Sequence, residues 1–397
     1  MLLTLSGKGL LAQIDTVSLQ EVSVVEKRNS KFALGSQVFT IDSAQLKSYQ
    51  GQTLTEVLQF ESGIYLKHYS PANLASTSFR GGNASQTALT WNGFNINSPL
   101  NGIFDLSLFP VSAFDEVKVQ PGASSALWGS GAVGGSIHLS QRPNFKPRFN
   151  INLSSQAGSF GFHQESVGID FGSKRFSHRL MVLNQFATND FEYLNPFTNQ
   201  VETQRNNEVG TRALLSENYF SLNPKNLFSL NWWYQQTDRN TPPTLFETTL
   251  ANQTDDVSRL TAEWFHQLKK GELKTRGAWF SEFQDYTNLT DDTAYFNNSQ
   301  TFIGEVEFSR KLKSGFNVDL GFNQTSFVAD VQSYKSDPRW QHRQSAFAGL
   351  SKSLFTKLDF SAMLRQEFID GETAPFTYTL GAAWKIYKGL SLKGQHS

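Results

Sequence analysis

Residues 79–98 read FRGGNASQTALTWNGFNINS, and residues 115–139 read DEVKVQPGASSALWGSGAVGGSIHL. Both stretches combine many glycines with short runs of β-forming residues, and neither is regular enough to cross a membrane. They come directly before residues 147–397, in which long strands of alternating polarity predominate. The sequence therefore predicts a compact, glycine-rich N-terminal domain that leads into a wall of amphipathic strands.

The composition is polar but weakly charged. The 397 residues include 35 Lys plus Arg and 35 Asp plus Glu, so the net charge is zero and gives no argument for a nucleic-acid partner. Charged residues make up only 18% of the chain, although the mean hydropathy is −0.38. The polarity therefore comes from Ser, Thr, Asn and Gln. The chain has no Cys, which excludes disulfides and thiolate metal sites.

The polar and apolar faces of the strands alternate with period two. Phe302, Val306 and Phe308 alternate with Glu305 and Glu307, and no window approaches 18 consecutive apolar residues. A soluble β-sandwich or propeller would show the same alternation, but its strands are mostly five or six residues long. Many strands here exceed about ten residues, which favours a transmembrane β-barrel.

The connections between these strands indicate two different rims. About thirteen strands are expected, joined by short turns and longer polar loops in strict alternation after a first tight turn at 158–161. The short turns are expected near 172–174, 224–226, 269–271, 313–315, 355–357 and 387–389. The long loops are expected near 189–204, 240–254, 288–298 and 329–340. This pattern predicts periplasmic turns on one rim and extracellular loops on the other.

Local signals outline the N-terminal domain. Asp42 and Ser43 can cap a short helix, Thr53 and Glu56 form a capping box for the next one, and Asn92-Gly93 is a strong hairpin signal. Short strands are expected at 37–41, 64–67, 77–80, 88–91, 116–120 and 136–139. These elements predict an α+β domain over 36–142, followed by a linker at Pro143 and Pro147.

The two ends of the chain are also expected to carry information. Residues 1–12 resemble the end of a signal peptide, and 13–35 contain an extended periplasmic segment with a linker. The barrel part is expected over 147–397. Because the sequence stops part-way into a strand, and lipid cannot satisfy an open sheet edge, we expect a C-terminally truncated barrel.

Several motifs of other protein classes are weighed and set aside. Residues 129–134 match G-x-G-x-x-G, but a strand follows instead of a helix, so a dinucleotide site is rejected. The pairs Asp255-Asp256 and Asp291-Asp292 are expected in loops, where they are either solvated charges or calcium ligands. The seven His residues have no metal-ligand spacing, and no clustered nucleophile and base marks an outer-membrane enzyme. We expect neither catalysis nor a bound metal.

At these residues the chain resembles a TonB-dependent outer-membrane receptor. Residues 54–58 with 62–64 resemble the helix and strand "DVL…PGV" of that family, and 79–85 with 91–94 resemble its "IRG…LIDGV" core. Residues 126–129 with 132–137 resemble its "AVYG…AIGGVINI" end. Two positions depart from the pattern: Gln120-Pro121 stands where relatives have an arginine, and Asn92 replaces an acid. The resemblance is closest to the vitamin B12 and siderophore receptors.

The resemblance implies a plug inside a barrel of about 22 strands. Ligand would bind on apical plug loops at 67–75 and 97–104 and on extracellular loops, through Tyr69, Ser70, Asn73, Asn97, Ser98 and Asn101. A TonB box would pair with the periplasmic energiser by strand addition, and its residues would be Leu19, Gln20, Glu21, Val22, Ser23, Val24 and Val25. Plug-core or plug–barrel roles fall to Arg80, Gly81, Gly93, Glu116, Gly129, Gly134 and Gly135.

The function implied is TonB-dependent uptake of a scarce chelate, cobalamin or a ferric siderophore, across the Gram-negative outer membrane. The expected partners are the TonB-type energiser, a small chelate and outer-membrane lipid, with a monomeric receptor, no cofactor and no nucleic acid. A plugged barrel that recognises a macromolecule or glycan, as an adhesin or signalling receptor, is the main alternative. An outer-membrane enzyme is the third.

Overall fold

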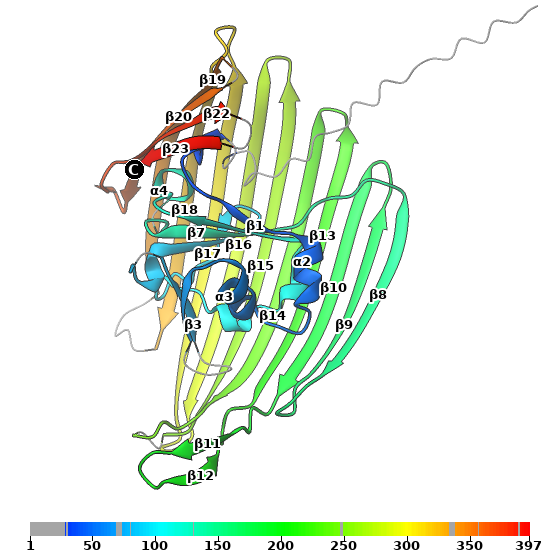
Figure 1. The fold of residues 1–397 in the computed structure, drawn as a ribbon, viewed down its shortest axis with the longest axis vertical. Helices are drawn as coiled ribbons and strands as arrows, with labels where there is room; N and C mark the ends of the chain where they lie inside the picture. The colour runs from blue at the N-terminus through cyan, green and yellow to red at the C-terminus, as the bar shows by residue number, and fades with distance from the viewer. Residues whose placement is uncertain are drawn as a thin grey trace, which may run out of the picture.

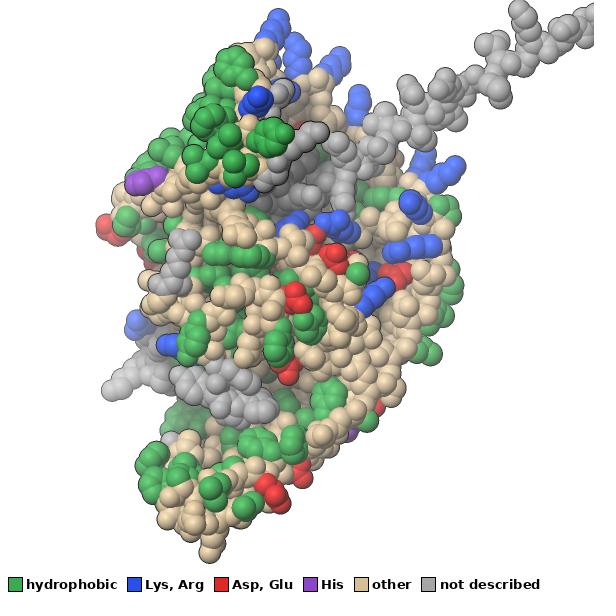
Figure 2. Space-filling view, viewed as in Figure 1, with side chains coloured by type: hydrophobic (Ala, Val, Ile, Leu, Met, Phe, Trp, Pro, Cys, Tyr) green, Lys and Arg blue, Asp and Glu red, His purple; other side chains and the backbone are tan. Residues whose placement is uncertain are grey.

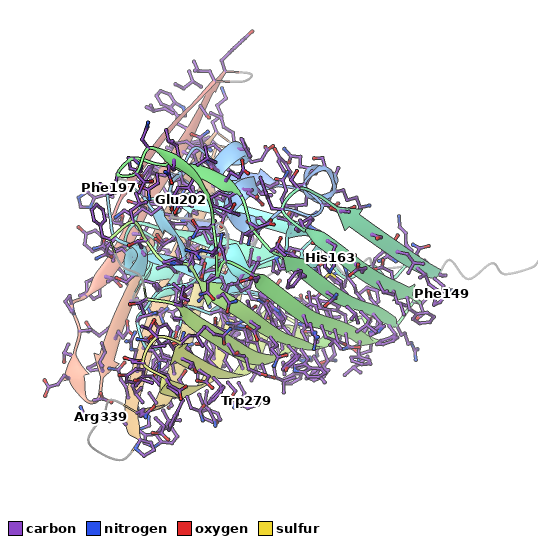
Figure 3. All side chains as sticks on the ribbon, turned by 90° about the horizontal axis from the view of Figure 1, so that it is seen from below. Phe149, His163, Phe197, Glu202, Trp279 and Arg339 are labelled. Carbon is purple, nitrogen blue, oxygen red and sulfur yellow. The ribbon has the colours of Figure 1, made fainter. Side chains whose placement is uncertain are left out.

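The computed structural model describes residues 28, 31–68, 74–79, 81–129, 131–246, 249–332, 338–355, 357–387 and 390–397. A small α+β domain lies against a tall, curved antiparallel sheet (Figure 1). Seen from below, the sheet curves around that domain from Phe149 on one side to Arg339 on the other (Figure 3). Among the helices in the described ranges, none is long and apolar enough to cross a membrane. The arrangement confirms a plug domain beside the wall of a partial barrel.

The plug is built on a five-stranded sheet of order β1-β6-β7-β4-β5, in which only β4 and β7 run parallel. A separate hairpin pairs β2 with β3. The strands are β1 (Phe39–Ile41), β2 (Tyr65–His68), β3 (Ala75–Ser78), β4 (Thr87–Trp91), β5 (Phe94–Asn95), β6 (Glu116–Pro121) and β7 (Gly135–Ser140). The helices are α2 (Ser43–Ser48), α3 (Leu54–Glu61) and α4 (Ser125–Trp128), with 3₁₀ turns η1 (Ala84–Gln86), η2 (Leu106–Leu108) and η3 (Val111–Ala113).

The helix starts lie where the capping signals predict them. The Asp42 carboxylate accepts the backbone N–H groups of Ala44 and Gln45 at 2.9 and 3.0 Å. At α3 the Glu56 carboxylate accepts the backbone N–H of Thr53 at 2.6 Å, which satisfies a donor that the first helical turn leaves without a partner. Helix α4 was not predicted, because four residues are too short to show a helical period.

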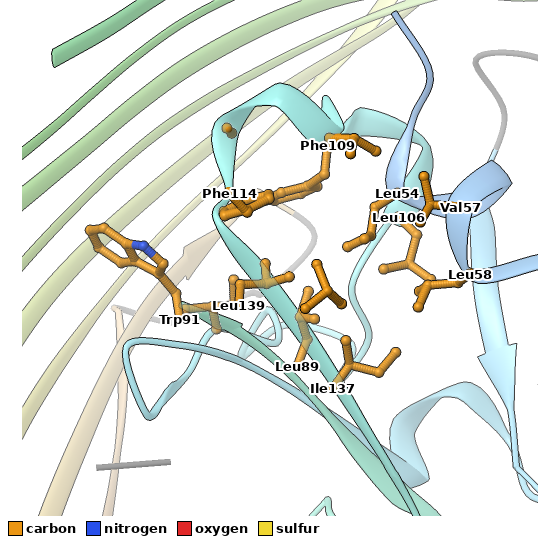
Figure 4. Packing of buried hydrophobic residues seen from close by; sticks show 14 of the residues in the cluster. Leu54, Val57, Leu58, Leu89, Trp91, Leu106, Phe109, Phe114, Ile137 and Leu139 are labelled. Carbon is orange, nitrogen blue, oxygen red and sulfur yellow. The ribbon is translucent and has the colours of Figure 1, made fainter. Parts of the chain in front are cut away.

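The plug core forms where helix α3 packs on the sheet. Leu54, Val57 and Leu58 of α3 are fully buried and face Leu89 and Ile137 of the sheet (Figure 4). The predicted hairpin at Asn92-Gly93 is present, and both residues have a positive φ, 50° and 82°. Asparagine tolerates this conformation better than other non-glycine residues, so Asn92 suits the turn.

The wall is a single antiparallel path of thirteen strands in the described residues, with β21 paired to β20 beside it. Each strand pairs with its neighbour in the chain, as in an up-and-down barrel. The first strands are β8 (Arg148–Ala157), β9 (His163–Gly172), β10 (Phe176–Ala187), β13 (Val209–Asn223), β14 (Asn226–Thr241), β15 (Ala251–Leu268) and β16 (Gly271–Asn288). They are followed by β17 (Thr293–Lys311), β18 (Asn317–Val331), β19 (Arg339–Leu354), β20 (Leu358–Ile369), β21 (Glu372–Thr373), β22 (Thr377–Tyr387) and β23 (Leu390–His396).

The polarity of the wall is inverted relative to a soluble protein. On β17, Phe302 and Val306 are 41% and 45% exposed on the outer face, whereas Glu305 and Glu307 are buried against the plug. The same inversion holds on β18, where Leu320 is exposed and Asp319 is buried. Apolar side chains outside and polar ones inside are what a lipid-embedded barrel requires, so the predicted membrane barrel is preferred to the soluble sandwich.

The predicted short turns all lie between successive strands, but the predicted long loops are only partly correct. The β16–β17 connection contains only residues 289–292, and β15 begins at Ala251, inside the range expected to be a loop. The 189–204 loop folds as a hairpin of β11 (Glu192–Asn195) and β12 (Gln200–Thr203). Polar residues continue the strand pairing beyond the length that a bilayer needs, about 9–11 residues, and strict alternation of short and long connections is therefore wrong.

The strand assignments also bear on the glycine motif and on the two aspartate pairs. The glycine motif at 129–134 leads into strand β7, which agrees with rejection of a dinucleotide site. Asp255 and Asp256 lie inside β15 instead of in a loop, whereas Asp291 and Asp292 form the β16–β17 turn. In the described part of the chain, no group of three or more His, Cys, Asp or Glu residues could hold a metal ion.

Candidate functional site

The plug loop between β5 and η2 is a rigid platform near the rim that carries the long connections. The Asn97 side chain accepts the Leu89 N–H at 2.8 Å and donates to the carbonyls of Thr87 and Gly102, both at 2.9 Å. Its amide is therefore used to fix the loop. Ser98 and Asn101 extend from this fixed loop to the wall of a cavity.

We call this cavity the outer vestibule. It has a volume of about 500 Å³ and lies between plug residues 98–109 and strands β14–β18. The barrel side is formed near the strand ends that carry the long connections, because Arg239 lies close to the end of β14 and Asp255 close to the start of β15. Phe104 and Phe109 of the plug contribute aromatic surface.

Each arginine in the vestibule wall has a carboxylate partner. Arg239 Nη1 lies 2.6 Å from Asp105 Oδ2, and its Nη2 lies 3.3 Å from Asp255 Oδ2. Arg259 Nη2 lies 3.2 Å from Glu282 Oε1, and its guanidinium also stacks 5.0 Å from the Trp233 ring centroid. These ion pairs are partly buried, so each charge depends strongly on its partner.

Asp105 also holds two plug loops together. Its Oδ1 accepts the Ala75 N–H at 3.0 Å and the hydroxyl and N–H of Ser107 at 2.7 and 3.1 Å. Because its other oxygen binds Arg239 on β14, one carboxylate connects the β3 end, η2 and the barrel. We call Asp105 with its partners Ala75, Ser107 and Arg239 the vestibule floor, because these contacts fix the plug loops to β14.

A second space, the inner cavity, lies deeper between plug and wall. It has a volume of about 260 Å³ and shares Ser98 with the vestibule. Its plug side includes Trp128 and Gly129, where a Cβ on Gly129 would lie 3.3 Å from Arg365 Nη2. The charged side chains in its wall are Arg28, Arg276, Arg343 and Arg365, with Glu305 and Glu367.

The chain before β1 is held between the plug and the wall. Arg28 Nη2 lies 2.5 Å from Glu305 Oε1 and 2.9 Å from Glu307 Oε2, and its Nη1 donates to the Leu127 carbonyl at 3.3 Å. Burial lowers the pKa of Arg28, but the two carboxylates raise it more, so the pKa ends above its ordinary value. Arg28 therefore stays charged and connects α4 of the plug to β17.

Two more contacts continue this attachment toward the short-turn rim. Lys31 Nζ lies 2.7 Å from Asp319 Oδ1, near the start of β18. The Ser36 hydroxyl donates to Gln395 Oε1 at 2.5 Å, and Gln395 Nε2 donates to the Ala123 carbonyl of the plug at 3.0 Å. We call Arg28, Lys31 and Ser36, with their partners, the N-terminal clamp.

An aromatic cluster docks the centre of the plug on the barrel. Trp233 of β14 is buried, and its ring centroid lies 4.7 Å from Phe109, 5.5 Å from Trp91 and 5.6 Å from Phe114. Beside this cluster, Gln235 Nε2 donates to the Leu108 carbonyl at 2.8 Å. The plug is thus attached by both apolar and polar contacts.

The predicted plug residues divide into three groups. Gly81, Gly93 and Gly129 have positive φ, and a Cβ on Gly135 would approach the Gln120 carbonyl oxygen to 2.8 Å, so these positions require glycine. Gly134 packs tightly against the Gln86 carbonyl. Glu116 contacts Lys118 and Arg142, which keeps it within the plug and its linker. The residues outside the described ranges are Tyr69, Ser70, Asn73, Arg80 and the proposed TonB box at 19–25.

Sequence reasoning did not identify the clamp or the vestibule ion pairs. A local signal existed for Glu305 and Glu307, because two carboxylates on the inner face of one strand require cationic partners. No local signal indicates that Arg28 supplies one of them, since the residues are far apart in the chain. At the departure noted above, Gln120 is fully buried, and neither its amide nitrogen nor its amide oxygen has a hydrogen-bond partner among the described residues.

Comparison with known proteins matches this architecture. Residues 30–136 match the TonB-dependent Receptor Plug Domain family. The vitamin B12 transporter BtuB of Vibrio vulnificus is 28% identical over 162 residues, which cover 38% of this chain and 26% of that transporter. BtuB of Photobacterium profundum is 23% identical over 128 residues, covering 32% of this chain and 21% of that protein.

Solved structures share the fold at low identity. A point mutant of the ferric enterobactin receptor PfeA of Pseudomonas aeruginosa has a TM-score of 0.75 at 13% identity, covering 94% of this chain and 62% of that one. The siderophore receptor PiuA of Acinetobacter baumannii has a TM-score of 0.66 at 16% identity, covering 89% and 63%. The copper transporter OprC has a TM-score of 0.73 at 12% identity, covering 91% and 64%.

The chain thus spans less than two thirds of the length of these structures, and its aligned part covers about a quarter or less of the transporters. The named relatives and neighbours are transporters and receptors, in agreement with the expectation that the chain is not an enzyme. Residues 30–136 therefore form a domain of the TonB-dependent Receptor Plug Domain family, and this domain is set against part of a barrel wall whose fold is similar to that of the receptors and transporters named above.

Proposed function

We propose that the chain is part of a receptor that takes up a scarce chelate, cobalamin or a ferric siderophore, across the outer membrane. The ligand binds in the outer vestibule, against Ser98 and Asn101 of the plug loop and the facing strands. Energy arrives through residues 19–25, which pair in extended form with a periplasmic TonB-type energiser.

The N-terminal clamp is the observation that carries this proposal. The first described residue after the proposed TonB box, Arg28, contacts both the plug at Leu127 and the barrel at Glu305. A pull on 19–25 would therefore act first on contacts that join the plug to its wall. The vestibule and inner cavity meet at Ser98, so loosening of the plug would extend a space that is already present.

The test separates binding from energised transport. In the full-length receptor, Val24→Pro removes a backbone donor needed for strand addition without touching the vestibule. We expect unchanged ligand affinity in detergent and at least a tenfold loss of ligand accumulation in cells, whereas the control Val17→Pro, outside the box, retains accumulation. If Val24→Pro and Val17→Pro accumulate ligand equally, the energised-uptake proposal is wrong.

A further inference from the structure

The two ends of the barrel wall carry opposite charge. Exposed carboxylates occupy the connections at the long-loop end, at Asp190, Glu192, Asp291, Asp292, Asp370 and Glu372. Exposed lysines occupy the short turns at the other end, at Lys174, Lys225, Lys269, Lys270, Lys313 and Lys357. Figure 2 shows Lys and Arg gathered at the upper end of the molecule, away from the β11–β12 hairpin. A ligand that enters past the carboxylates meets a negative potential.

The vestibule behind that rim does not offset this negative charge. Its wall contains two arginines and three carboxylates, and Arg259 is paired with Glu282 while Arg239 is paired with Asp105 and Asp255. An anionic ligand would have to compete with carboxylates that already hold these guanidinium groups. A polyanion therefore gains little at this site and is repelled on approach.

The vestibule wall also contains polar atoms that could pair with a ligand. Gln235 Oε1 and Arg259 Nε are buried in its wall and have no hydrogen-bond partner among the described residues. A buried polar atom without a partner is costly, and a ligand amide or hydroxyl could remove that cost. The Phe104 and Phe109 side chains in the same wall offer surface for a flat or apolar ligand face.

The inner cavity disfavours free metal cations. Four arginines and two glutamates line it, with Arg28 and Arg276 both bound to Glu305. A bare metal cation that passed the acidic rim would next meet an excess of positive charge. The succession from acidic rim to arginine-rich cavity thus disfavours both strong anions and free cations on the same path.

We infer that the outer vestibule selects a chelate without net charge, one that presents amide or hydroxyl groups and an apolar or ring face, and that it rejects polyanionic chelates, while the arginine-rich inner cavity opposes free metal ions. This inference rests on the proposed uptake function and adds the charge class of the ligand. Polyanionic chelates are rejected by the rim carboxylates, which repel them, and by the vestibule arginines, whose charges are already paired.

Binding to full-length receptor in detergent tests the inference with probes of different charge. The probes are a neutral ferric trihydroxamate, a neutral cobalt corrinoid, a trianionic ferric tricatecholate and Cu²⁺. We expect a neutral probe to bind at least tenfold more tightly than the tricatecholate or Cu²⁺ in low salt. Salt should narrow the gap between the neutral probe and the tricatecholate, because it screens repulsion at the exposed rim.

Opposite ends of β16 supply a matched pair of variants. Asp291→Asn with Asp292→Asn removes two rim charges, and asparagine suits the positive φ of residue 292. This variant should improve tricatecholate affinity threefold or more without changing neutral-probe affinity. Lys269→Gln with Lys270→Gln, at the other end, should not improve it.

The outcomes distinguish the inference from the function on which it rests. Tighter binding of the tricatecholate or Cu²⁺ than of either neutral probe would overturn the charge inference and leave chelate uptake standing. An unchanged tricatecholate affinity in the Asp291→Asn, Asp292→Asn variant would overturn the role of the rim. Failure of every probe to bind would contradict the uptake function itself, and the inference with it.

Discussion

Arg28 and Glu305 form an ion pair between the N-terminal segment and the barrel wall. The guanidinium Nη2 lies 2.5 Å from the carboxylate Oε1, and both side chains are buried. Arg28 lies before the plug, and Glu305 lies on the inner face of β17. Since Arg276 also binds Glu305, two cations share one carboxylate. The pair connects the N-terminal segment to the barrel in one contact.

Arg28→Gln should therefore loosen the clamp without unfolding the barrel. Loss of one partner from a buried ion pair typically costs about 3–5 kcal/mol, and Arg276 retains part of that stabilisation for Glu305. We expect amide hydrogen exchange in residues 31–41 to accelerate at least tenfold. Arg148→Gln, which removes a contact within the barrel between Arg148 and Asp170, is the control and should leave those amides unchanged. Equal exchange in both variants would show that the clamp does not hold this segment.

Neighbouring tryptophans on β14 test how the plug is docked. Trp233 is buried against the plug, whereas Trp232 is 42% exposed on the opposite face. Trp233→Ala should lower the free energy of plug unfolding by about 3–5 kcal/mol, since it removes a large buried ring. Trp232→Ala should cost less than about 1 kcal/mol in the same urea titration. A similar cost for the two variants would contradict docking through the aromatic cluster.

Asp105→Asn tests the vestibule floor. The amide oxygen can still accept from Ala75 and Ser107, but the charge that pairs with Arg239 is lost. We expect about a tenfold loss of ligand affinity, which corresponds to about 1.4 kcal/mol, because the apical loops are no longer fixed to β14. Asp170→Asn, at a carboxylate away from the vestibule, should bind ligand normally. Normal ligand affinity in Asp105→Asn would show that the vestibule floor does not contribute to ligand binding.

His138 makes plug stability depend on pH. Burial, with a smaller contribution from Lys118, lowers its pKa to about 3, and its ring nitrogens contact Thr90 and Ser136 at 2.7 and 2.9 Å. The unfolded chain therefore binds more protons than the folded plug below the ordinary His pKa of about 6.5. The free energy of plug unfolding should be fully present above that pH and fall by about 1.4 kcal/mol per pH unit toward pH 3.

The measurement uses a fluorophore on Val133→Cys, since the chain has no native cysteine and Val133 is exposed. Urea midpoints at pH 7.5 and pH 5 should differ in the parent protein. The difference should shrink in His138→Gln and persist in His163→Gln, whose side chain is exposed on β9. A pH dependence that survives His138→Gln would assign it to other groups.

Most of the plug could be predicted because its signals are local. Asp42, Thr53 and the Asn92-Gly93 turn each act on backbone groups a few residues away, so sequence alone locates them. The barrel strands were predictable from their period, but their ends were not. Residues 293–298 were expected in a loop, yet they pair with β16, because strand pairing continues beyond the length that a bilayer needs.

The clamp and the vestibule ion pairs could not be predicted in the same way. Arg28 and Glu305 are 277 residues apart, and Asp105 and Arg239 are 134 apart. Which cation meets which carboxylate depends on the position of the plug inside the wall. No periodicity or capping rule encodes that position, so these contacts follow only from the three-dimensional structure.

We propose that the N-terminal segment must separate from the wall for transport. Lys31 and Asp319 form a clamp contact that suits a reversible cross-link. The sequence has no native cysteine, so cysteines placed at these two positions can react only with each other. In the full-length receptor, Lys31→Cys with Asp319→Cys can be bridged by a short bifunctional thiosulfonate and released by reductant. Arg148→Cys with Asp170→Cys, on β8 and β9, is the matched control within the barrel.

Ligand uptake by cells, measured before and after reduction of the 31–319 bridge, shows whether this separation is required. We predict that the bridged receptor binds ligand with unchanged affinity but loses at least nine tenths of its uptake, that reduction restores uptake, and that the 148–170 bridge has no effect. Uptake by the bridged receptor equal to that after reduction would show that the N-terminal segment does not have to separate from the wall.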